Sequence, residues 1–549
     1  LIVVSKESDS LIGLNTNGGM KMKGKKWLGM LTALSLCASM LAGCGSAAAS
    51  EEKADTAAAG TTAESGAAES STAAEGTNFD EEVELLMYCI GDEGGIYADE
   101  VLDNLNAMLK EKINATIKPV MVSWGEYKEK MPLIYASGEA YDLVYVANWM
   151  NYTSEALKGP FLELSELMPK YAPKTYAEFK ESGALDTALV DGKLYMVPSP
   201  TTDYTTYVTL WREDLRKKYN VPEITDWDSL AVYMDAIKEN EPDMLPLATG
   251  PQIFLNMLLM TENDWGQMTA GKSSTAAGGV VICKDEAGSK AFNLLDTPEY
   301  EAYVKRNREY YLKGYWSRNV LSETRMLAEA FEAGQSAITI GNKSNILQMY
   351  QKIKANNPDW ELDFKNFDAG SYIKVSPTNN GMAIGVNSKH PERAMAYLEL
   401  INQDEEVFRA MQYGIEGKTY VVDENGCKTT PEGVDPSTLA LRNLGMGTQV
   451  EKFMFKNAAD EQKVLDEFDS YESNAVYSPL TAFVFDDSAV AAECAAVANV
   501  LTEYKLPLDF GVSDPETALP ELREKVKEAG VDKIIDEVNR QLEEYFAAQ

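Results

Sequence analysis

The sequence predicts an α/β protein of two lobes, each built on a mainly parallel sheet. Two observations support this fold class. From residue 83 onward, short apolar runs alternate with segments of helical periodicity, and strands connected by helices usually pair in parallel and are covered on both faces. The chain has 549 residues, of which 45% are hydrophobic. This is enough material for two cores of ordinary domain size.

The first predicted elements form a βαβ unit. Residues 83–90, VELLMYCI, read as a buried strand. Residues 99–113 place apolar side chains at helical intervals, and residues 114–122 return to a strand pattern. A further helix breaks at Gly138, and an apolar strand follows at residues 143–147.

The same alternation recurs in the second half of the chain. Thr297 followed by Pro298 predicts the start of a helix, and Gly314 predicts its end. Other strands and helices are predicted at residues 336–341, 381–386, 391–402 and 531–546. The last helix is amphipathic, with Ile535, Val538, Leu542 and Tyr545 on one face.

The net charge limits the possible partners. The formal charge is −36, and residues 1–43 contribute five lysines against two acidic residues, so the rest of the chain carries −39. Such a surface repels phosphate backbones and anionic lipid head groups, which argues against a nucleic-acid partner or a polybasic membrane contact.

The N-terminal region carries a targeting pattern. Four lysines precede an apolar stretch from Trp27 to Met40, and the sequence Leu-Ala-Gly-Cys ends at Cys44. This pattern resembles a bacterial lipoprotein signal. The resemblance implies cleavage before Cys44, a lipid on its thiol, and attachment to the outer face of the cytoplasmic membrane. A signal anchor and a simple secretory peptide are the alternatives. We expect residues 1–19 to be a gene-model extension and residues 20–43 to be the signal peptide.

Residues 44–78 are predicted to be a disordered tether. They consist almost wholly of Ala, Ser, Thr, Gly and Glu. They therefore have too little apolar surface to bury to offset the entropy lost on ordering. A flexible coil of this length spans about 30 Å. An Ala-rich helix is the alternative, which three glycines weaken.

The cysteines and the histidine exclude several kinds of site. Beyond Cys44, the exported part holds Cys89, Cys283, Cys427 and Cys494, far apart and without a C-x-x-C spacing. Buried free thiols or a disulfide are both open. Because His390 is the sole histidine, duplicated histidine ligands and several catalytic constellations cannot form. We therefore expect no metal and no cofactor.

Four segments, taken in order, resemble the family 1 extracellular solute-binding proteins of ABC importers, which have a maltose-binding-protein-like architecture. The segments are SGEAYDLV at residues 137–144, DGKLYMVP at 191–198, LWREDL at 210–215, and Phe331, Gly334, Ala337 and Ile340 at their helix–strand spacing.

The C-terminal part resembles the lipoprotein LipO-like subgroup of this family, which carries an extra C-terminal domain. The matching segments are residues 413–420, 478–486 and 529–545. Thr419 stands where the subgroup commonly has histidine.

The resemblance implies a type II periplasmic-binding-protein-like fold with two lobes and helical C-terminal additions. We expect lobe 1 to comprise residues 79–200 plus 378–440. Lobe 2 and the C-terminal domain are expected at residues 204–375 plus 441–549.

The implied function is that of a lipid-anchored, monomeric solute-binding protein without catalysis. The two lobes would close about a hinge at Ser199–Tyr204 and Ser376–Asn380 over an oligosaccharide or related polar solute and deliver it to an ABC permease. The energy would come from a separate ATPase, and no GxxxxGK[ST] loop occurs in this sequence.

Candidate ligand-binding residues follow from strand ends and from the resemblance. In open α/β sheets, ligands bind beyond the carboxyl ends of the strands, and aromatic faces with polar neighbours suit sugar rings. The candidates are Trp124, Asn148, Trp149, Tyr204, Trp211, Asn342, Lys343, Tyr413 and Glu416.

Three alternatives stay open from the sequence. A surface-anchored carbohydrate-active enzyme would use a pair of carboxylates, which 86 acidic residues always allow. A peptide-binding protein would also use Tyr and Trp. A sensor-coupled binding protein would share the two lobes but transmit its ligand state to another partner.

Overall fold

The computed structural model describes most of the chain after residue 78. The predicted signal peptide, Cys44 and the predicted tether lie outside the described residues. The description covers residues 79–548 except 202–203, 206, 251–254, 264, 268–280, 285–289, 324–326, 368–371, 435, 456–458, 473–474, 477 and 481–482. Within this part of the chain, no helix combines the length and the apolar character needed to cross a membrane.

Lobe 1 is built on a five-stranded sheet with the order β2-β1-β3-β16-β6. The central strand β1 (Val83–Ile90) pairs in parallel with β2 (Ala115–Val122) and with β3 (Leu143–Val146). Strand β16 (Gly381–Ile384) pairs antiparallel with β3 and with β6 (Val197–Pro198). The first three predicted strands are therefore confirmed.

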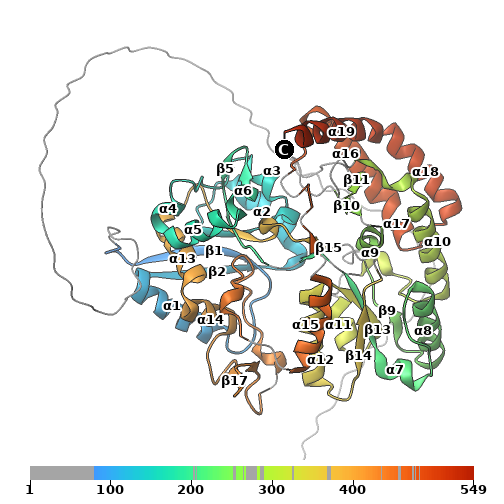
Figure 1. Ribbon diagram of the computed structural model, residues 1–549, viewed down its shortest axis with the longest axis horizontal. Coiled ribbons are helices and arrows are strands. Elements are labelled where there is room, and N and C mark those ends of the chain that lie inside the picture. The colour runs from blue at the N-terminus through green and yellow to red at the C-terminus, as the bar shows by residue number, and fades with distance from the viewer. Residues whose placement is uncertain are drawn as a thin grey trace, which may run out of the picture. The chain divides into compact units, whose positions relative to one another are not determined.

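Helices cover the lobe 1 sheet because their apolar faces match its buried faces (Figure 1). Helix α1 (Ala98–Ile113) buries Val101, Leu105 and Leu109 at helical spacing. The other helices of this lobe are α2 (Trp124–Ser137), α3 (Tyr152–Ala156), α4 (Met168–Tyr171), α5 (Pro173–Glu181), α6 (Ala184–Thr187), α13 (Pro391–Gln403) and α14 (Glu405–Tyr413). Two hairpins pair β4 (Leu189–Val190) with β5 (Lys193–Leu194) and β17 (Val421–Val422) with β18 (Lys428–Thr429).

Lobe 2 is built on a four-stranded sheet with the order β14-β8-β13-β9. Strand β13 (Ser336–Gly341) pairs in parallel with β9 (Leu245–Leu247) and antiparallel with β8 (Val208–Arg212). Strand β14 (Leu362–Lys365) is antiparallel to β8. The surrounding helices are α7 (Glu213–Lys218), α8 (Trp227–Asn240), α9 (Leu255–Glu262), α10 (Pro298–Lys313), α11 (Leu327–Glu332), α12 (Lys343–Asn356) and α15 (Ala459–Glu472).

Two further small sheets belong to this part of the chain. One has the order β10-β11-β12, with β10 (Trp265–Gln267), β11 (Val281–Lys284) and β12 (Phe292–Asn293). The other has the order β19-β15-β7, with β7 (Tyr204–Thr205), β15 (Tyr372–Lys374) and β19 (Ala475–Val476). Two strands of this second sheet, β7 and β15, adjoin the first and second connections between the lobes.

Each main sheet contains one reversed strand, so both are mixed rather than purely parallel. In lobe 1 this strand is β16, and in lobe 2 it is β8. Both follow directly after the chain has passed from one lobe to the other. A chain that arrives from the opposite lobe enters the sheet at the edge where the parallel strands end, and it must therefore run against them.

The C-terminal helices complete the core of lobe 2. Apolar side chains of these helices, such as Leu508, Val526 and Val538, share one buried cluster with Trp211 of β8 and Ile338 of β13. The helices are α16 (Ala491–Val500), a π-helical turn (Leu501–Lys505), α17 (Leu506–Asp509), α18 (Pro515–Glu528) and α19 (Val531–Ala547).

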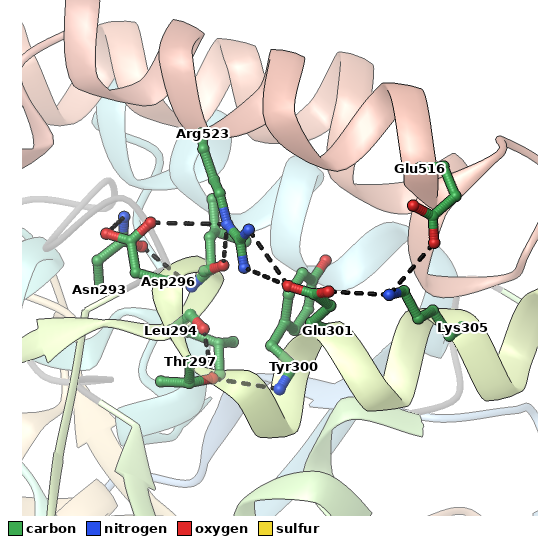
Figure 2. A network of polar contacts seen from close by, with 10 residues as sticks. Asn293, Leu294, Asp296, Thr297, Tyr300, Glu301, Lys305, Glu516 and Arg523 are labelled. Atoms are coloured by element: carbon green, nitrogen blue, oxygen red, sulfur yellow. Dashed lines mark hydrogen bonds and ion pairs between the residues drawn. The ribbon is translucent and has the colours of Figure 1, made fainter.

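Polar contacts tie α18 to α10 (Figure 2). The guanidinium of Arg523 donates to the Leu295 carbonyl at 2.7 Å and lies 3.4 Å from the Glu301 carboxylate. Lys305 lies between Glu301 at 2.9 Å and Glu516 at 3.2 Å. The predicted cap of α10 is confirmed, because the hydroxyl of Thr297 accepts the Tyr300 N–H.

The predicted boundary of lobe 1 at residue 440 is wrong. Leu444 and Val450 are buried in the core of lobe 1, whereas Val464 and Phe468 belong to a core of lobe 2. The chain therefore crosses between the lobes a third time, after Phe453. The apolar residues of this segment show neither helical nor strand periodicity, so they gave no local sign of which lobe they pack on.

Candidate functional site

The carboxyl ends of three strands define one edge of the lobe 1 sheet. Strands β1, β2 and β3 run in parallel, so the residues that follow them lie at the same edge. The N–H of Gly91, after β1, donates to the carbonyl of Val122 at the end of β2 at 2.9 Å. This is the edge at which an open α/β sheet binds ligands.

Two predicted site residues come together at this edge. Trp124 is the first residue of α2, and Trp149 lies in a short 3₁₀ helix (Asn148–Met150) after β3. Their rings are stacked, with centroids 6.4 Å apart and planes at 11°. Trp124 is 37% exposed, whereas Trp149 is partly buried against the core. Asn148, another predicted residue, directly precedes Trp149.

Residues of the second crossing, Asn379 and Asn380, hold the Trp149 ring in place. Its indole N–H donates to the Asn379 carbonyl at 2.9 Å. The hydroxyl of Tyr145 donates to the Asn380 side-chain oxygen at 2.7 Å. Burial raises the pKa of Tyr145 well above its usual value, so its hydroxyl stays protonated and remains a donor.

Acidic side chains surround the loop that follows β1. Asp92 and Glu93 are exposed. The guanidinium of Arg442 lies 2.6 Å from Asp99 and 3.3 Å from Glu93, and it also donates to the Ala98 carbonyl at 2.9 Å. These carboxylates hold the cation, so this part of the edge keeps a negative field.

The predicted residues Tyr413 and Glu416 lie beside the third crossing. The Tyr413 ring packs 5.1 Å from Phe455 and 5.9 Å from Tyr420, and burial raises its pKa. Glu416 is exposed, and its backbone forms a bridge with Tyr420. Thr419 is buried, and its hydroxyl donates to the Tyr413 carbonyl at 2.6 Å. The geometry gives Thr419 a role in the turn.

The predicted site residues of lobe 2 make their described contacts with other residues of lobe 2. The Asn342 side chain caps α12 by accepting the Asn345 N–H at 3.0 Å. The Lys343 ammonium lies 3.9 Å from the Asp469 carboxylate. Tyr204 lies in β7, paired with Lys374, and its side chain is outside the described part.

The prediction that Trp211 stacks on a ligand is wrong. It lies in β8, all of whose residues are buried, and it is only 2% exposed. Its indole N–H donates to the Glu213 carboxylate at 3.0 Å. Strand β8 lies between β14 and β13. Its side chains are therefore buried on both faces of the sheet.

The sequence reasoning missed the polar groups that hold Trp149. The sequence predicts Tyr145 only as part of a buried strand, and Asn379 and Asn380 only as part of a crossing. Both asparagines precede a strand that runs opposite to its neighbours, and this brings them to the ligand-binding edge. An amide pair directly before the apolar run at residues 381–386 was the available signal.

The described residues contain no group of three or more His, Cys, Asp or Glu side chains arranged to hold a metal ion. Cys89, Cys427 and Cys494 are buried, and burial raises the pKa of the Cys89 thiol strongly. Cys283 lies in β11, and its side chain is outside the described part.

The family of the chain follows from a comparison with family models. The model for bacterial extracellular solute-binding proteins matches residues 97–407, which is more than half of the chain. The protein is a bacterial extracellular solute-binding protein. A second model, a domain of unknown function (DUF3502), matches residues 479–547. This match covers α16 to α19, where an extra C-terminal domain was predicted.

One curated relative matches most of this solute-binding protein. It is a carbohydrate ABC transporter substrate-binding protein of Streptococcus pneumoniae serotype 4. The two chains are 26% identical over 476 residues, which are 84% of this chain and 90% of the relative.

Solved structures confirm the predicted two-lobe fold of this solute-binding protein. The N-glycan transport solute-binding protein NgtS of S. pneumoniae, in complex with Man1GlcNAc, has a TM-score of 0.70 at 24% identity, covering 85% of this chain and 100% of that one. The alginate-binding protein AlgQ2 has a TM-score of 0.61 at 18% identity, covering 84% and 98%. The S. pneumoniae substrate-binding protein FusA, solved with kestose, has a TM-score of 0.60 at 14% identity, covering 85% and 100%.

Proposed function

We propose that this protein captures an oligosaccharide outside the cell and delivers it unaltered to the permease of an ABC importer. Its family supplies the role of a solute-binding protein. The curated relative is named for carbohydrate transport, and two structural neighbours were solved with sugars, NgtS with Man1GlcNAc and with Man5GlcNAc and FusA with kestose. These names support a carbohydrate as the class of ligand.

The stacked pair of Trp124 and Trp149 carries the proposal. Two nearly parallel rings at the carboxyl edge of a sheet offer a flat apolar surface, and such a surface suits the apolar face of a sugar ring. The N–H of Trp149 is already bound to Asn379. The ligand therefore meets this residue through its ring face rather than through a polar bond.

The charges at this edge favour a neutral oligosaccharide over an acidic one. Exposed carboxylates of Asp92 and Glu93 lie on the loop after β1, and Arg442 is held by Glu93 and Asp99. An anionic ligand would approach against this field, and the repulsion weakens with salt.

Closure of the lobes links binding to transport in this proposal. A ligand held by both lobes makes part of its contacts only in the closed form, so it shifts the population toward closure by the difference in affinity. The permease then recognises the closed form. The residues proposed to contact the ligand are Trp124, Asn148, Trp149, Tyr204, Lys343, Tyr413 and Glu416.

A lipid on Cys44 is proposed to hold the monomeric protein at the outer face of the membrane. Replacing Cys44 by Ser should abolish metabolic labelling with palmitate and release the protein into the medium. A labelled Cys44→Ser variant that stays with the membrane fraction would overturn the anchor while leaving the ligand proposal untouched.

Thermal unfolding of the purified protein with a panel of ligands tests the proposed function. The panel contains Man5GlcNAc, kestose, an alginate oligosaccharide and a pentapeptide mixture. A neutral oligosaccharide should raise the melting temperature in a concentration-dependent manner, because ligands that bind only the folded state stabilise it by mass action. Recovery of the sugar with unchanged mass excludes cleavage.

Stabilisation by the peptides alone would overturn the proposal in favour of a peptide-binding protein. Recovery of a shortened oligosaccharide would overturn it in favour of an enzyme.

A further inference from the structure

The second crossing, residues 376–380, is bound on two sides within lobe 1. Ser376 starts a 3₁₀ turn (Pro377–Asn379), with its hydroxyl accepting the Thr378 N–H. Asn380 follows and is 7% exposed. The segment then enters β16 directly, so its backbone has little freedom at that end.

On one side, the segment holds the aromatic surface of the proposed site. The Asn379 carbonyl accepts the indole N–H of Trp149 at 2.9 Å. The next side chain, Asn380, accepts the hydroxyl of Tyr145 at 2.7 Å. Tyr145 is 1% exposed and its ring packs against Trp149 with centroids 6.4 Å apart. Both bonds span more than 200 residues of sequence, so they form only in the folded lobe.

On the other side, the segment is bonded to the first crossing, and through it to residues 447–449 of lobe 1, which precede the third crossing. The N–H of Ser199 donates to the Asn380 carbonyl at 2.9 Å, and the Ser199 hydroxyl accepts the Gln449 N–H at 2.8 Å. The backbones also pack closely, because a Cβ on Gly447 would lie 2.7 Å from the Gly381 carbonyl oxygen. The first two crossings and residues 447–449 thus form one bonded unit at the lobe 1 edge.

We propose that Tyr145 is a positioning residue that couples the Trp149 ring to this unit. It touches no ligand in the proposed site. Its hydroxyl orients the Asn380 side chain, and this fixes the position of the neighbouring Asn379 carbonyl. That carbonyl in turn fixes the plane of the Trp149 indole. This inference rests on the proposed function for its effect on binding, but the geometric coupling stands on the contacts alone.

Loss of the Tyr145 hydroxyl has a defined local consequence. The buried oxygen of the Asn380 side chain is left without its donor, and an unsatisfied buried acceptor is costly. The amide turns to find another partner, and the carbonyl of the preceding residue moves with the backbone. The indole bond of Trp149 then lengthens or breaks, and its ring loses its fixed plane.

The first experiment needs no ligand. The protein is labelled with 5-fluorotryptophan at every tryptophan that remains after removal of the predicted signal peptide, which contains Trp27, and Trp149→Phe assigns the Trp149 fluorine resonance. Tyr145→Phe should shift or broaden that resonance. Tyr152→Phe is the matched control, because Tyr152 is also buried, at 2%, and donates to a backbone carbonyl, that of Ala188 at 3.3 Å.

An unchanged Trp149 resonance in Tyr145→Phe would overturn the coupling. An equal shift in Tyr152→Phe would overturn it as well, because the effect would then be a general loss of core packing.

The second experiment measures binding of Man5GlcNAc by calorimetry in a double-mutant cycle. Tyr145→Phe should weaken binding about fivefold to tenfold, in keeping with one buried hydrogen bond, and Tyr152→Phe should leave it unchanged. In the Trp149→Phe background, Tyr145→Phe should cause no further loss, since residues that act through one another are not additive. Additive losses would contradict action through Trp149.

The two failures are distinguishable. If the unaltered protein binds neither Man5GlcNAc nor the other sugars of the panel, the proposed function fails. The fluorine resonances then still decide whether Tyr145 positions Trp149.

Discussion

The two lobes use equivalent sheet edges in different ways. At the lobe 1 edge, Trp124 and Trp149 stack on each other and Trp124 reaches solvent. At the lobe 2 edge, Asn342 caps a helix and Lys343 faces Asp469. Trp211, the predicted site tryptophan of lobe 2, fills the core. Corresponding sheet edges therefore do not give equal chemistry, because the contacts that a side chain makes within its own lobe decide what it can offer a ligand.

The largest expected effect is a difference in stability between the Trp211→Ala and Trp124→Ala variants. Trp211→Ala should lower the free energy of unfolding by about 3–5 kcal/mol, because it opens a cavity in a packed core. Trp124→Ala should lower it by at most about 1 kcal/mol, since its ring is partly exposed. Urea denaturation of both variants measures the difference. Similar losses would remove the contrast between the lobes.

The bond between Trp211 and Glu213 makes lobe 2 sensitive to pH. Burial acts to raise the pKa of Glu213, but hydrogen bonds from Arg216 and Trp211 outweigh it and lower the pKa. A lowered folded-state pKa stabilises the fold above the unfolded pKa of about 4.3, and this stability is lost as the pH falls through the folded-state pKa.

Glu213→Gln should therefore lower the stability at pH 7 by about 1–3 kcal/mol. The difference from the unaltered protein should shrink as the pH falls below about 4. Urea denaturation from pH 7 to pH 3 measures it. Glu361→Gln is the control, since Glu361 pairs with Lys217 on the surface, and its pH profile should follow that of the unaltered protein.

The affinity for the ligand should depend on the aromatic pair of lobe 1. Trp149→Ala should weaken oligosaccharide binding at least about tenfold, since a buried aromatic anchor typically contributes more than about 1–2 kcal/mol to binding. Calorimetry with the sugar identified in the thermal panel measures this. Unchanged affinity in both Trp149→Ala and Trp124→Ala would remove the pair from the site.

The smallest expected effect concerns the cap in lobe 2. Asn342→Ala should lower the stability by about 0.5–2 kcal/mol, the usual cost of losing a helix cap. The affinity for the sugar should change little if the amide serves α12 alone. A tenfold loss of affinity at unchanged stability would instead return Asn342 to the ligand-binding residues.

Local signals predicted the elements of the fold well. The apolar run at Val83–Ile90, the cap at Thr297 and the stop at Gly314 act within a few residues, and the structure has all three. The position after a strand also placed Trp124 and Trp149 at one edge. These features depend on periodicity and on backbone preferences that a sequence carries locally.

Features set by long-range pairing could not be predicted in the same way. The reversed direction of β8 and β16, the third crossing after Phe453 and the burial of Trp211 depend on which distant strand or helix lies beside each segment. The positions of Asn379 and Asn380 in the site follow from the reversed strand, so they were missed for the same reason.

The interleaving of the two cores has a consequence for the order in which the protein can fold. The core of lobe 1 draws on residues from Val83 to Val450, and that of lobe 2 on residues from Trp211 to Leu542. Neither core can be completed while the later part of the chain is missing. Contacts between residues so far apart in sequence also form slowly. A partly synthesised chain of this extracellular protein thus lacks part of each core until residues 450 and 542 have been added.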